Sequence, residues 1–133
     1  MSLPLLDEHV ATVDADRDAV WRAVRTYAGR LSDSPHAALG RLLGAEPVSG
    51  FRIADELEGE SVTLEGRHHF ASYRLILETY AHGGSSTELR VRSLADFRGA
   101  SGQVYRALLM GTRGHVLAVR HLIRTVRRMA EAA

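Results

Sequence analysis

The feature that most constrains this sequence is the amphipathic pattern of its last quarter, from Gly102 to Ala133. At a period of about 3.6 residues per turn, one face carries Val104, Leu108, His115, Leu122 and Val126. The opposite face carries Arg106, Arg113, Arg120, Arg124 and Arg127. A dry face and a wet face predict one long helix, roughly 45 Å in length, whose apolar side covers the rest of the chain.

Gly111 and Gly114 interrupt this predicted helix near its middle. Each costs about 1 kcal/mol relative to alanine, so both need a reason. Three interpretations stay open: close approach of a ligand, a kink that opens the mouth of a pocket, or packing against a sheet. His115 follows directly and lies in the centre of the apolar face, so this region is the first candidate for a binding site.

Between Pro47 and Phe97 the hydrophobic period changes to two, which is typical of strands. Four strands are predicted, with apolar faces that begin at Phe51, Val62, Tyr73 and Leu89. Short loops fix the register by the pairs Leu57–Val62, Phe70–Tyr73 and Leu77–Val91, the last across a loop of Gly83, Gly84 and Ser85. The pattern predicts an antiparallel meander with one apolar face, which the final helix covers.

The N-terminal part predicts a strand over Leu6–Ala15, rich in β-branched residues. Asp16 is placed to cap a helix over Arg17–Ala28, which Gly29 would end. A shorter helix is predicted over Ser34–Gly44, because serine caps a helix and Pro35 is tolerated at its first position.

The chain has 133 residues, 45% of them hydrophobic, which fits one domain over residues 1–133. It has no cysteine, so disulfide and thiolate chemistry are excluded. No apolar run has membrane-spanning length, and the expected location is the cytoplasm. His68 and His69 point to opposite faces of a strand and match no ligand spacing, so neither a metal nor a cofactor is expected.

The segment VDADRDAVWRAV, from Val13 to Val24, resembles the strand-to-helix opening of the SRPBCC or START-like superfamily. The predicted order of elements resembles that superfamily too, which includes polyketide cyclases, lipid-transfer domains and pollen-allergen-like proteins. The resemblance implies an α+β helix-grip fold, in which an antiparallel sheet curves around a long C-terminal helix and two short helices follow the first strand. The family usually has six strands between its short helices and its long helix, whereas four are predicted there in this sequence, which implies a smaller or more open cavity.

Five polar residues interrupt the apolar faces: Asp55, His68, Thr79, Ser93 and His115. Such groups bond one another, reach water or line a cavity, because burying them unpaired is costly. The predicted register places Asp55 diagonally next to His68, within reach of a carboxylate–imidazole bond. The catalytic candidates are therefore His115, His68 and Asp55, and the alternative for His68 is a satisfied core histidine.

The predicted cavity lies between the sheet and the final helix. Its predicted lining is Phe51, Ile53, Leu64, His68, Leu75, Leu77, Val91, Leu108, Gly111, His115 and Leu122. The favoured function is binding of a small hydrophobic or aromatic molecule. The alternatives are a polyketide cyclase or dehydratase-like enzyme with a pocket histidine as acid and base, and an interaction protein with a filled core; the sequence does not decide whether the protein is an enzyme.

The arginine face has an ordinary explanation as a solvated helix surface whose last turn favours cations. Neither a nucleic-acid partner nor membrane insertion is therefore expected. Leu109, Met110 and Leu117 fall near the arginines. They either meet the two short helices or form a homodimer contact.

Overall fold

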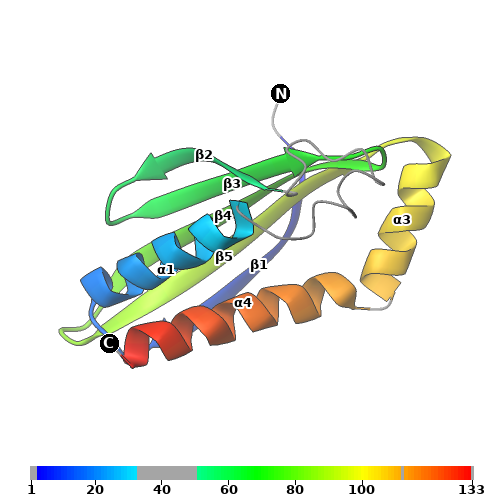
Figure 1. The fold of residues 1–133 in the computed structure, drawn as a ribbon. Helices are drawn as coiled ribbons and strands as arrows, with labels where there is room; N and C mark the ends of the chain where they lie inside the picture. Colours follow the sequence, from blue (N-terminus) through cyan, green and yellow to red (C-terminus); the bar gives the residue numbers. More distant parts are fainter. Residues whose placement is uncertain (1–2, 33–50, 112, 133) are drawn as a thin grey trace.

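The computed structural model describes residues 3–32, 51–111 and 113–132. In chain order the elements are β1 (Leu5–Val13), α1 (Arg17–Ser32), β2 (Arg52–Leu57), β3 (Ser61–Arg67), β4 (Ala71–His82), β5 (Ser86–Phe97), α3 (Gly99–Gly111) and α4 (Gly114–Glu131). The strands form one antiparallel sheet in the order β1-β5-β4-β3-β2. Helices α1 and α4 lie side by side against one face of this curved sheet, and α3 stands steeply at its end (Figure 1). The predicted α+β helix-grip architecture is confirmed.

The core lies between the sheet and the pair α1 and α4. Every second residue of β3, β4 and β5 is buried over most of their length, which confirms the period-two interpretation. The fully enclosed residues come from both layers and include Val20, Val24, Leu64, Leu77, Leu89, Val91 and Val126. Their removal from water is the main force that holds the two helices on the sheet.

The N-terminal predictions are largely confirmed. Asp16 caps α1, because its Oδ1 accepts a hydrogen bond of 2.8 Å from the backbone N–H of Ala19. Gly29 does not end the helix, which continues to Ser32. The helix predicted over Ser34–Gly44 lies outside the described residues.

The register of the meander agrees with the prediction in one hairpin and differs in two. Leu77 pairs with Val91 as expected. Val62 pairs with Glu56 instead of Leu57, because the first loop holds three residues, 58–60. Tyr73 pairs with Gly66 instead of Phe70, because the second hairpin turns earlier, where the N–H of His68 bonds the carbonyl oxygen of Ala71.

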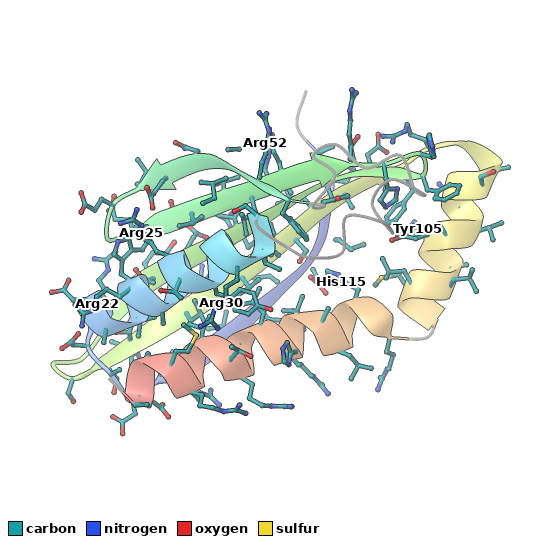
Figure 2. The ribbon with its side chains drawn as sticks, viewed as in Figure 1. Arg22, Arg25, Arg30, Arg52, Tyr105 and His115 are labelled. Atoms are coloured by element: carbon teal, nitrogen blue, oxygen red, sulfur yellow. The ribbon has the colours of Figure 1, made fainter. Side chains whose placement is uncertain are left out.

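The edge strand β2 does not contribute the apolar face predicted for it. All its residues are exposed, with Ile53 at 44% and Leu57 at 53%. A salt bridge of 2.7 Å from Arg25 Nε to Glu56 Oε1 ties β2 to α1, and Arg25 is labelled in Figure 2. The buried face of the sheet is therefore formed by the other four strands.

The prediction of one long helix over Gly102–Ala133 is wrong. Helix α3 ends at Gly111 and α4 begins at Gly114, with Arg113 in the left-handed conformation at φ 59°. Two glycines within four residues make continuation of a helix unfavourable, so the kink is the interpretation that the structure supports. The break turns Val104 and Leu108 outward, each 61% exposed. None of the described helices is long and apolar enough to cross a membrane.

Candidate ligand-binding site

A pocket of about 280 Å³ lies where β1, β4 and β5 meet α3 and the start of α4. The kink between the two helices shapes it, since α3 and α4 present different sides to the sheet. Figure 2 shows Tyr105 on α3 and His115 on α4, both on the sheet side of their helices. The wall of the pocket has an aromatic end and a polar end.

The aromatic end gathers around His68, at the turn between β3 and β4. The centroid of its ring lies 5.0 Å from that of Tyr105 and 5.6 Å from that of Tyr73. Phe70 stacks on Tyr105 with centroids 5.6 Å apart, and Phe97 lies 6.2 Å from the same ring. The rings make edge-to-face and stacked contacts with one another, and all of them except that of Phe70 line the pocket.

The turn that carries His68 is held by its own hydrogen bonds. The backbone N–H of Phe70 donates to His68 Nδ1 at 3.1 Å, and the guanidinium of Arg98 donates to the His68 carbonyl oxygen. Because Nδ1 accepts a hydrogen bond, the proton of the neutral ring sits on Nε2. The orientation and the tautomer of His68 are thus set locally.

The histidine and tyrosine side chains that line the aromatic end are uncharged near neutral pH. Burial lowers the pKa of His68, and the nearby charges of Arg98 and His69 lower it further. Burial, with the neighbouring Tyr105, raises the pKa of Tyr73 to about 12, and burial also raises the pKa of Tyr105. This end of the pocket therefore offers neutral hydrogen-bonding groups on an aromatic wall.

The polar end is formed by the wall residues His115 and Ser93, and Asp7 is bound to His115. His115 Nε2 lies 3.1 Å from Asp7 Oδ1, and His9 Nε2 lies 3.2 Å from Asp7 Oδ2. Burial acts to raise the pKa of Asp7, but the hydrogen bonds and charges of His115 and His9 together hold this pKa below its usual value. Asp7 is consequently a carboxylate that fixes the His115 ring on the pocket wall.

Ser93 differs from the other buried polar residues of the sheet. It is 4% exposed and lines the pocket, yet its hydroxyl has no hydrogen-bond partner among the described residues. Thr79, by contrast, donates to the Gly59 carbonyl oxygen at 2.9 Å and accepts from Arg17. A buried hydroxyl without a partner is costly, so Ser93 marks a place where a further group fits.

The predicted lining divides into three groups. Phe51, His68, Leu75 and His115 line the pocket. Leu64, Leu77, Val91 and Leu122 lie in the packed core, and Ile53, Leu108 and Gly111 are exposed.

The predicted contact between Asp55 and His68 is wrong. A bulge between Ile53 and Asp55, together with the shifted register, places Asp55 opposite Thr63. Its carboxylate is exposed and accepts the backbone N–H of Glu56. The carboxylate partner of a pocket histidine is Asp7, and that histidine is His115.

Sequence reasoning missed Tyr73, Tyr105 and Leu109 as wall residues, and it missed Asp7, which bonds the wall residue His115. Tyr105 and Leu109 are four residues apart and share one face of α3, a signal that the arginine pattern of a continuous helix concealed. Among the described residues, no group of three or more His, Asp or Glu side chains is arranged to hold a metal ion.

Comparison with known proteins by sequence finds no matching family model and no similar curated protein. Comparison of structures finds START superfamily protein from Mycobacterium smegmatis, at 13% identity and TM-score 0.56, over 96% of this chain and 98% of that one. Truncated norcoclaurine synthase from Thalictrum flavum matches at 11% identity and TM-score 0.59, over 97% and 96%. Zhui aromatase/cyclase from Streptomyces sp. R1128 matches at 14% identity and TM-score 0.55, over 94% and 92%. The chain has the SRPBCC or START-like fold.

Proposed function

We propose that this protein binds a small hydrophobic or aromatic molecule in the pocket between the sheet, α3 and α4. The observation that carries the proposal is the wall itself: stacked aromatic rings at one end and an unpartnered buried hydroxyl at the other. Ligand sites are usually apolar concavities with a few placed polar groups, of about 300–1,000 Å³. A volume of about 280 Å³ favours a molecule at the small end of that range.

The similar structures support the same class of ligand. Their names include an aromatase/cyclase and a START superfamily protein, and a norcoclaurine synthase structure contains dopamine and hydroxybenzaldehyde. At such low identity the likeness concerns the fold. The ligand class proposed for this chain therefore depends on its own wall residues.

Filling part of the pocket should weaken binding. Ala95 lines the pocket on β5, so Ala95→Phe is expected to weaken binding of 2-methylnaphthalene by at least about tenfold, or about 1.4 kcal/mol. Equilibrium dialysis measures the affinity, and Ala81→Phe on the exposed end of β4 is the matched control. No saturable binding by the unsubstituted protein, or equal losses in both variants, would contradict the proposal.

A second candidate function is proton transfer at a carbon next to a carbonyl group. The observation that favours it is the contact of His115 with Asp7, because a carboxylate that orients an imidazole prepares it as an acid and base. A neutral His115 would take the α-proton and leave an enolate. The ring would exchange that proton with solvent and then return one to the carbon.

This exchange can be followed by NMR as deuterium incorporation into 2-tetralone in D₂O. The unsubstituted protein is expected to accelerate exchange of the α-hydrogens over buffer, and His115→Phe is expected to lose the acceleration. Binding of 2-methylnaphthalene by the same variant serves as the control for an intact pocket. Exchange at the buffer rate with binding intact would leave only the binding function.

A further inference from the structure

The polar end of the pocket is built on one row of paired residues across the sheet. Asp7 on β1 pairs with Ser93 on β5, and Ser93 pairs with Leu75 on β4. Paired residues of antiparallel strands project to the same face, with Cβ atoms about 4.5–5.5 Å apart. Ser93 and Asp7 are therefore neighbours on the inner face of the sheet.

Asp7 nevertheless does not take up the hydroxyl of Ser93. Its Oδ1 is bound to His115 and its Oδ2 to His9, and no bond joins it to Ser93 among the described residues. Ser93 as a whole is only 4% exposed. The unsatisfied hydroxyl thus belongs to a residue of the pocket wall, and the residue paired with it on the neighbouring strand is the carboxylate Asp7.

We infer that the pocket selects an uncharged ligand that bears a hydroxyl group, held by Ser93 beside the Asp7–His115 pair. This inference rests on the binding function proposed above and names the chemistry of its ligand. A serine hydroxyl can donate one hydrogen bond and accept others, so it matches a ligand group that also does both. Ser93 is then the specificity-determining residue.

The neighbouring charge decides against an acidic ligand. A ligand carboxylate at Ser93 would lie close to the Asp7 carboxylate, and two like charges repel in a partly buried site. The guanidinium of Arg74, which also lines the pocket, is already paired with Glu65 at 3.5 Å. A methyl group in the same place would leave the Ser93 hydroxyl without a partner, as it is in the described structure, and would gain no hydrogen bond. A neutral hydroxyl meets neither obstacle.

The sheet also sets the direction of the ligand body. The next inward pairs after Ser93–Leu75 are Ala95–Tyr73 and Phe97–Ala71. These lead from the polar end toward the stacked rings of Phe70 and Tyr105. A ligand with its hydroxyl at Ser93 therefore places its apolar body against the aromatic end.

Three probes of one size test the inference by equilibrium dialysis at pH 7.5: 2-naphthol, 2-methylnaphthalene and 2-naphthoate. The unsubstituted protein is expected to bind 2-naphthol about tenfold more tightly than 2-methylnaphthalene, the effect of one well-placed hydrogen bond. Binding of 2-naphthoate is expected to be the weakest of the three. Because the three probes carry the same ring system, the order of their affinities reports the effect of the substituent alone.

Substitutions test whether Ser93 causes the preference for 2-naphthol. Ser93→Ala is expected to reduce the tenfold preference for 2-naphthol to near parity while 2-methylnaphthalene binds as before, and Ser93→Thr, which keeps a hydroxyl, is expected to retain it. Ser86→Ala, on the same strand but at the far hairpin, is the matched control and is expected to change nothing.

The possible results distinguish the role of Ser93 from the binding function itself. Equal binding of 2-naphthol and 2-methylnaphthalene, or a preference that survives Ser93→Ala, overturns the role of Ser93 and leaves the binding function standing. Tightest binding of 2-naphthoate overturns the exclusion of acids by Asp7. Failure of all three probes to bind contradicts the binding function itself.

Discussion

Replacing Leu122 with alanine is expected to lower the free energy of unfolding by about 2–5 kcal/mol, the range for large-to-small changes in a packed core. Leu122 lies on α4, is 3% exposed, and belongs to the cluster that joins α1, α4 and the sheet. The cost combines the lost burial of the side chain with the void that it leaves. Urea unfolding followed by circular dichroism measures it.

Leu117→Ala is the matched control on the same helix. Leu117 is 60% exposed, so its truncation is expected to change the stability by less than about 0.5 kcal/mol. The comparison also tests the extent of the pocket. A small effect at Leu122 would mean that this residue faces an open, hydrated space, as its place in the predicted cavity lining implied, and that the core described here is not dry.

The alternation of the strands carried most of the fold prediction. Over β4 and β5 most of the alternate, inward positions are apolar, and a glycine-containing loop joins the strands. Only one register therefore buries the apolar residues of both strands on the same face, the one that pairs Leu77 with Val91. In the first hairpin the apolar residues of β2 are not buried at all. Burial therefore did not constrain the register of the first hairpin, and the predicted pairing of Val62 was wrong by one residue.

The sequence also indicated a possible kink in the last helix but did not determine that it forms. Gly111 and Gly114 were identified as the weak point of the last helix, but packing, ligand approach and kinking predict the same residues. The choice among them depends on whether α3 finds a better surface at the end of the sheet than along α4. That is a property of the tertiary structure, and it decides that Tyr105 faces the pocket and Leu108 does not.

The polar end of the site lay furthest beyond sequence reasoning. Asp7 and His115 are separated by 108 positions, and no local pattern reports such a contact. His115 was found because a polar residue on an apolar helical face is conspicuous. Asp7 was not, because it stands near the start of a strand, where an exposed acid is the ordinary expectation.

Gly102 is the point where the fold fixes the aromatic end of the pocket. It is buried in the first turns of α3, where a Cβ atom would lie 2.9 Å from the carbonyl oxygen of Phe70 and 3.0 Å from the carbonyl carbon of Phe97. Both are backbone atoms, and the Phe70 oxygen also accepts the N–H of Arg98 at 2.9 Å. Neither can move aside without disturbing the turn that carries His68.

Gly102→Ala is therefore expected to destabilise the protein by about 1–3 kcal/mol, as overpacking does, although alanine favours a helix. Gly29→Ala is the control, because nothing lies within 4 Å of its Cβ position inside α1, and it is expected to stabilise by about 0.5–1 kcal/mol. Urea unfolding measures both. Since Tyr105 follows Gly102 by less than one turn, displacement of α3 should also separate Tyr105 from Phe70 and weaken binding of 2-methylnaphthalene. A neutral or stabilising Gly102→Ala with unchanged binding would show that the close approach of α3 does not hold this wall in place.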